Sequence, residues 1–221
     1  MRQRTRPLSD AITRRNALLI AGGAILVLVL AVAASGLFET PLFAIVSDPF
    51  TTTDAGVLTG AVSHLGVLLW WAGATIALFA AHVLRGKPGQ REARRFLLGS
   101  GLISAYLTFD DLFLLHEQVL NKITPLPQPG VLAITALVTG LFLYRYRSFV
   151  RTTAWPVLLT AGAMFAASLA IDFVSDVGVY ADAWELPKAA TFLEESFKWF
   201  GIVAWATYII GLSAEVVRAE P

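Results

Sequence analysis

Ionisable side chains interrupt an otherwise apolar stretch of the chain, residues 104–117. Asp110, Asp111, His116 and Glu117 lie there among leucine and phenylalanine side chains. A charged group within the hydrocarbon of a membrane costs about 3 kcal/mol or more, so such groups are rare and mark a functional site by default. Imidazole and carboxylate groups bind zinc, iron or manganese, and they also carry protons. The stretch therefore predicts a polar site suited to either chemistry.

A metal site would draw its ligands from this stretch and from one histidine elsewhere in the chain. The candidate metal ligands are His64, Asp110, Asp111, His116 and Glu117. Neighbouring residues of a helix point about 100° apart, so only one of Asp110 and Asp111 is expected to face the centre of the site. The Glu-x-x-His spacing of di-iron helix bundles does not occur in the chain. The expected cofactor is a divalent cation (Zn, Fe or Mn) held in another arrangement.

A second group of polar residues lies further along the chain. Asp172 or Glu194 is expected to act as a further metal ligand or as the general base for a metal-bound water. Lys198 shares a helix face with Glu194, and it is expected either to form an internal ion pair or to hold an anionic group of a substrate. The remaining residues of the predicted polar site are Ser104, Asp176 and Glu195.

The composition is that of a membrane protein. Of the 221 residues, 56% are hydrophobic and 15% are charged, whereas a soluble domain has about 25% charged residues. No cysteine is present, which excludes disulfides, thiolate metal ligands and cysteine nucleophiles. The net charge of +1 indicates no particular partner, and we expect no binding to nucleic acid.

Six apolar stretches are long enough to cross the lipid bilayer, for which a helix needs about 20 residues. They are residues 17–38, 57–84, 96–120, 131–149, 154–179 and 189–213. The fourth is the weakest, because its uninterrupted apolar run stops at Tyr144. The sequence thus predicts an all-α fold, an integral membrane bundle of six transmembrane helices in a single domain, residues 1–221. Small residues at positions 99–101 and 162–167 predict close contacts between helices.

Basic residues determine the predicted orientation in the membrane. Fourteen arginine and lysine residues lie in the two tails and in the second-to-third and fourth-to-fifth connections, whereas the opposite loops contain Lys122 and Lys188. Since basic loops stay on the cytoplasmic side, both termini are expected to be cytoplasmic. With a rise of about 1.5 Å per residue, the polar residues of the second, third, fifth and sixth helices then share one layer. This predicts a single site that is open to the non-cytoplasmic side.

The pattern D-D-x4-H-E at residues 110–117, together with E-E-x2-K at residues 194–198, resembles a pattern in uncharacterised bacterial six-span membrane proteins. This resemblance covers most of the chain. It implies a multi-pass protein of the bacterial plasma (inner) membrane, and it carries no activity with it.

A partial resemblance is to the alkaline-ceramidase-like membrane hydrolase superfamily, whose members hold zinc inside a helical bundle with three histidines, supported by an aspartate and a serine. Ser104, Asp110 or Asp111, His116 and His64 would match part of that set. The chain departs in having six predicted spans instead of seven and too few histidines. Its last helix also has acidic residues and a lysine where the superfamily has a His-x3-His pair. The resemblance implies zinc-dependent hydrolysis by analogy.

Three functions fit these observations, beside a polar core with a structural role alone. The first is a metal-dependent, membrane-embedded enzyme, hydrolase-like, acting on a lipid or a small amphiphile. The second is a proton or cation transporter or channel subunit, since rows of carboxylates suit a proton relay. Against it, the cytoplasmic halves of the spans offer little beyond Thr75, His82 and Thr207. The third is an accessory subunit of a membrane complex, whose charges pair with a partner. The substrate and the oligomeric state stay open.

Overall fold

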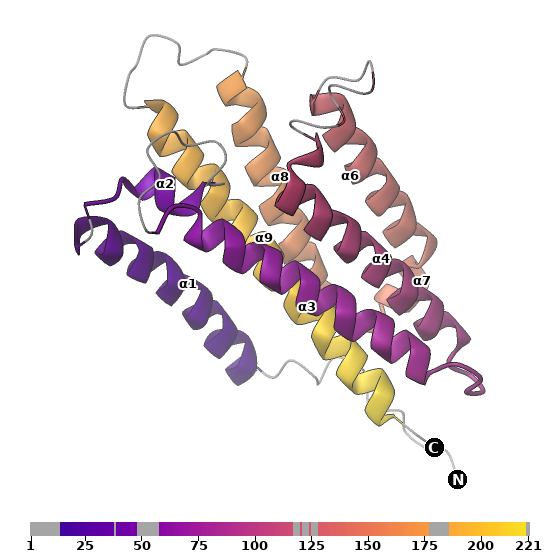
Figure 1. Ribbon diagram of the computed structural model, residues 1–221. Helices are drawn as coiled ribbons and strands as arrows, with labels where there is room; N and C mark the ends of the chain where they lie inside the picture. Colours follow the sequence, from indigo (N-terminus) through magenta and orange to yellow (C-terminus); the bar gives the residue numbers. More distant parts are fainter. Residues whose placement is uncertain are drawn as a thin grey trace. The chain divides into compact units, whose positions relative to one another are not determined.

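All regular secondary structure in the described part of the chain is helical. The computed structural model (Figure 1) describes residues 14–37, 39–47, 58–116, 120, 124, 128–176 and 186–219. The helices are α1 (Arg14–Leu37), α2 (Leu42–Val46), α3 (Ala61–Val83), α4 (Arg91–Phe113), α6 (Gln128–Arg145), α7 (Arg147–Val150), α8 (Trp155–Asp176) and α9 (Leu186–Arg218). For these residues the all-α prediction is confirmed.

Five helices are long enough and apolar enough to cross a membrane. The candidate spans are Leu18–Leu37, Ala61–Val83, Arg91–Phe113, Trp155–Val174 and Ala189–Arg218. The apolar part of α6, Pro129–Arg145, is shorter, and it lies in the stretch that the sequence indicated as the weakest span. These helices indicate a membrane protein that crosses the bilayer several times. The count of six spans stays a prediction.

The chain divides into two compact units, and each is described here by itself. The first unit contains Trp70–Leu158 and Ala206–Pro221, and the second contains Arg15–Leu69 and Leu159–Trp205. The larger part of α3 and all of α4, α6 and α7 therefore belong to the first unit. Helices α1 and α2 and most of α8 belong to the second.

In the first unit, one face of α4 is buried along its whole length. Its buried residues are Ala93, Phe96, Leu97, Ser100, Gly101, Ser104, Thr108 and Asp110, and the spacing of three and four residues between most of them is that of one helix face. The ring of Phe96 is fully buried. It packs on Phe142 of α6 and on Phe149 of α7, with ring centroids 5.4 and 5.3 Å apart. Aromatic packing thus joins α4 to α6 and α7.

Small residues allow α3 and α4 to approach each other closely. A Cβ atom built on Gly101 would lie 2.8 Å from Cγ of Leu78 and 3.2 Å from the carbonyl oxygen of Ala74. Gly99 makes room for another helix: a Cβ on Gly99 would collide with the ring of Phe142 on α6. Residues 99–101 therefore form the close contact that the sequence predicted. At Gly162, by contrast, no heavy atom of the described neighbouring residues would lie within 4 Å of a Cβ.

In the second unit, α1, α2 and the start of α3 pack around Trp199 of α9. The buried core consists of Ala24, Ala31, Ile45, Val46, Val62 and Trp199. The indole Nε1–H of Trp199 donates a hydrogen bond to the carbonyl oxygen of Ala24 at 3.2 Å. Trp199 is therefore a packing residue at the centre of this core.

We predict that Gly101→Ala destabilises the protein, because the added methyl group overlaps Leu78 and the backbone of α3. Overpacking of this kind costs about 1–3 kcal/mol. Thermal unfolding of the purified protein in detergent measures the loss. The matched control is Gly140→Ala in α6, where a Cβ meets nothing within 4 Å among the described residues, so the melting temperature should stay the same or rise. Equal stability of Gly101→Ala and wild type would contradict the close packing.

Candidate functional site

The end of α4 carries the candidate site. The helix ends at Phe113, and Leu114 follows in the left-handed conformation, with φ of 50° and ψ of 45°. The backbone N–H of Leu114 donates to the carbonyl oxygen of Asp110. A left-handed residue other than glycine costs about 1–2 kcal/mol, so other interactions must stabilise this ending. The sequence had predicted a helix as far as residue 120.

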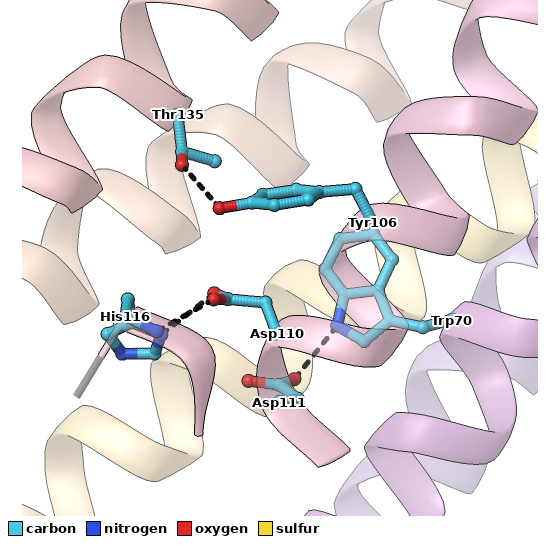
Figure 2. Close-up of polar contacts among 6 residues, drawn as sticks. All are labelled: Trp70, Tyr106, Asp110, Asp111, His116 and Thr135. Atoms are coloured by element: carbon cyan, nitrogen blue, oxygen red, sulfur yellow. Dashed lines mark hydrogen bonds and ion pairs between the residues drawn. The ribbon is translucent and has the colours of Figure 1, made fainter. Parts of the chain in front are cut away.

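The carboxylate of Asp110 holds His116 at two points (Figure 2). Oδ1 accepts the backbone N–H of His116 at 3.0 Å, and Oδ2 lies 2.8 Å from the ring nitrogen Nδ1. Both residues are buried, with 4% of Asp110 and 8% of His116 exposed. The two contacts fix the path of the chain after α4 and also the orientation of the imidazole ring.

An imidazole held in this way is prepared for chemistry at its other nitrogen. When the ionised carboxylate of Asp110 accepts the Nδ1–H of His116, the neutral ring carries its lone pair on Nε2. Metal-binding histidines are oriented by carboxylates through the same arrangement, and so are histidines that transfer protons. The geometry therefore suits a metal ligand or a proton acceptor at Nε2.

Asp111 points away from this pair, toward α3 (Figure 2). Its Oδ2 accepts the indole Nε1–H of Trp70 at 3.1 Å. Trp70 is buried, and the sequence gave no sign of its hydrogen bond, because the partner lies 41 residues away. The expectation that neighbouring carboxylates point in different directions is confirmed. Asp110 is the one that meets His116.

Two further polar contacts lie on α4. The hydroxyl of Tyr106 is 3.3 Å from Oγ1 of Thr135 on α6 (Figure 2), a contact that the sequence did not predict. The hydroxyl of Ser104 donates to the carbonyl oxygen of Ser100 at 2.9 Å. Ser104, which was predicted to belong to the polar site, is buried on the same helix as Asp110 and bonds to the backbone of that helix.

The other predicted site residues lie in the second unit or outside the described residues. His64 is exposed on α3, and Asp172 on α8 is half-buried, as are Glu194, Glu195 and Lys198 on α9. Glu117 and the side chain of Asp176 lie outside the described residues. The predicted meeting of four helices at one site therefore stays a prediction, because its members belong to both units.

Within the described residues, no three histidine, aspartate or glutamate side chains gather closely enough to hold a metal ion. Of the five candidate ligands, the structure brings together Asp110 and His116. Asp111 lies beside them in the chain but bonds to Trp70. A metal site at the end of α4 would thus need ligands in addition to those that the structure brings together.

Comparison with known proteins identifies a family. A family model described as "Domain of unknown function (DUF8692)" matches residues 17–212. The chain belongs to this family. No curated protein and no solved structure matches the chain. The match spans every candidate site residue from His64 to Lys198, but it assigns no chemistry to them, and the likeness to alkaline-ceramidase-like hydrolases stays a prediction.

We predict that Asp110→Asn reverses the tautomer of His116. The asparagine amide would donate a hydrogen bond to Nδ1, which moves the ring proton to Nε2. NMR spectra of protein with ¹⁵N-labelled histidine distinguish the two tautomers. Loss of a hydrogen bond to a charged group should also lower the stability by about 1–3 kcal/mol.

Asp111→Asn is the matched control, because it makes the same change at the neighbouring residue without touching His116. The spectrum of His116 should then be that of wild type. An unchanged His116 signal in Asp110→Asn would show that the carboxylate does not determine the tautomer.

Proposed function

We propose that this protein is a membrane-embedded, metal-dependent enzyme of the hydrolase type, with its site at the end of α4. The observation that carries the proposal is the buried contact between Asp110 and His116. Buried titratable pairs in apolar helices are characteristic of functional sites. A carboxylate on one nitrogen of an imidazole supports metal binding at the other.

In this proposal His116 is a metal ligand and Asp110 is the carboxylate that orients it. Glu117 follows His116 directly in the chain, and with Asp111 and His64 it completes the set of candidate ligands. The metal would be zinc, iron or manganese, which accept imidazole together with carboxylate. When bound, it would supply a water that loses a proton near neutral pH. Asp172 or Glu194 would take up that proton, and Lys198 would hold an anionic group of the substrate.

The surroundings of the pair support a lipid or a small amphiphile as substrate. Phe109, Leu112 and Phe113 lie in the last turns of α4 and are exposed, and the rings of Phe109 and Phe113 are stacked at 6.0 Å. Exposed apolar side chains on a membrane helix face lipid. An amphiphile could therefore bring its polar part to His116 while its apolar part stays in the bilayer.

The proposed topology has six spans, with both termini on the cytoplasmic side of the plasma membrane. Helix α7 continues α6 almost directly, because Tyr146 N–H donates to Phe142 O at 3.2 Å and Val150 N–H donates to Tyr146 O at 2.9 Å. At 1.5 Å per residue, the two helices together extend for about 34 Å, which is enough to cross the hydrocarbon core. This length supports the fourth predicted span.

The first test is elemental analysis of the detergent-purified protein. We expect roughly one or two equivalents of zinc, iron or manganese per chain, and we expect their loss in the double variant His116→Ala/Glu117→Ala. His82→Ala, which removes an exposed histidine of α3, is the control and should retain the metal. A folded wild-type protein without metal, or a double variant that keeps it, would refute the metalloenzyme.

A proton or cation pathway is the second candidate, and a row of buried hydroxyl groups favours it. The row precedes Asp110 on the buried face of α4 and consists of Ser100, Ser104 and Thr108. Within the described residues the hydroxyl of Ser100 is buried without a hydrogen-bond partner, and such groups often bind internal water. Tyr208 and Thr153 form another buried polar pair in the same unit, with their oxygens 2.9 Å apart. These groups add polar side chains in regions where the sequence indicated few.

The pathway predicts pH-dependent cation uptake into liposomes that contain the protein. Asp110→Asn should abolish the uptake, because it removes the only charge of this row, and Ser100→Ala should reduce it. The control is Thr75→Val, since Thr75 is exposed and bonds to the backbone of its own helix. Uptake no faster than in empty liposomes would refute the pathway.

A further inference from the structure

The cytoplasmic end proposed for the first unit contains a cluster of aromatic rings around Phe96. Three of its neighbours are Phe142, Tyr146 and Phe149, with ring centroids 5.3 to 5.6 Å from that of Phe96. Tyr208 of α9 adds a fourth ring at 6.3 Å. The cluster thus fixes the first turns of α4 against the end of α6 and against α7 (Figure 1).

Two arginines project from the turn that places Tyr146 in this cluster. The guanidinium of Arg147 lies 4.4 Å from the ring centre of Tyr144, and its Nη1 donates to the carbonyl oxygen of Tyr144 at 3.1 Å. The guanidinium of Arg145 lies 5.5 Å from the ring centre of Tyr146. Both arginines are exposed. Contacts with aromatic rings hold them in position while they face outward.

Further positive charge comes from the start of α4. Arg95 directly precedes Phe96 in the chain and is exposed, so it belongs to the same turn of α4 as the central ring of the cluster. Arg91 and Arg94 belong to the same turns, and Glu92 is the acidic residue in the first turn of α4. Arginines from two parts of the chain therefore lie in the turns that carry the rings of one cluster, and they outnumber the acidic residue there.

The side chains next to these arginines suit lipid tails. Leu141 and Tyr144 on α6 are 59% and 64% exposed, and Leu98 and Leu102 on α4 are also exposed. A soluble anion would gain nothing from such a surface. A phospholipid can place its phosphate at the arginines and its acyl chains on the apolar side chains.

We propose that Arg145 and Arg147, together with Arg95, bind the head group of an anionic phospholipid at this end of the first unit. Arginine presents several N–H donors in a plane that matches phosphate oxygens. Basic residues between membrane helices are typical of binding sites for anionic lipids. The site is separate from the His116 site, so the proposal does not depend on the proposed enzyme.

The experiment is native mass spectrometry of the delipidated protein in detergent, titrated with phosphatidylglycerol or with phosphatidylcholine of the same acyl chains. We expect wild type to bind phosphatidylglycerol at least about tenfold more tightly, since several arginines attract the anionic head group and phosphatidylcholine has no net charge. Arg145→Gln/Arg147→Gln should lose this preference. Arg85→Gln/Arg218→Gln removes the same charge from exposed arginines outside the aromatic cluster and should retain it.

Three results would overturn the proposal. One is equal binding of both lipids by wild type, and another is equal loss of preference in the two double variants, which would indicate diffuse attraction to positive charge. The third is binding of inorganic phosphate as tightly as phosphatidylglycerol, which would indicate an anion site without a lipid. If Arg145→Gln/Arg147→Gln fails to fold, the lipid preference of the single variant Arg147→Gln is compared with that of the single variant Arg218→Gln.

Discussion

The carboxylate of Asp110 accepts the backbone N–H of His116 with Oδ1, just after the end of α4, and contacts the imidazole of His116 with Oδ2. A chain that leaves a helix within or near a membrane must find acceptors for its free backbone N–H groups, because lipid offers none. Asp110 supplies one to His116 and, through its own carbonyl group, another to Leu114. The carboxylate that accepts a backbone N–H after the helix end therefore also fixes the side chain of His116. Loss of this carboxylate would disturb both.

The rest of the first unit is arranged around α4. Gly101 brings α3 close enough for Trp70 to reach Asp111, and Phe96 fixes the opposite end of α4 against α6 and α7. Helix α4 thus presents Gly101 and the carboxylate of Asp111 toward α3, and Gly99 and the ring of Phe96 toward α6. A helix held at both ends in this way can keep Asp110 in place while its lipid-facing side remains apolar.

Hydrophobicity and length were enough to predict α1, α3, α8 and α9, since their cores are long apolar runs. The same criterion failed at both ends of α4. It started the helix at residue 96, although α4 begins at Arg91, because charged residues at a membrane surface do not count as apolar. It continued the helix to residue 120, because no local pattern shows that the side chain of Asp110 captures a backbone N–H six residues later. The hydrogen bond from Trp70 to Asp111 spans 41 residues and depends on the packing of α3 against α4, which sequence spacing does not determine.

The true start of α4 changes the depth at which Asp110 lies. Counted from Arg91, Asp110 is about 28 Å along the helix, whereas the hydrocarbon core is about 30 Å thick. If the arginines of the first turn lie at one surface of the membrane, Asp110 and His116 lie close to the other surface rather than at the centre. Burial of ionisable groups costs less there, because water and lipid head groups are near. The polar parts of amphiphiles also lie at this depth, so the length of α4 agrees better with the proposed enzyme than with the alternative proposal of a path through the membrane.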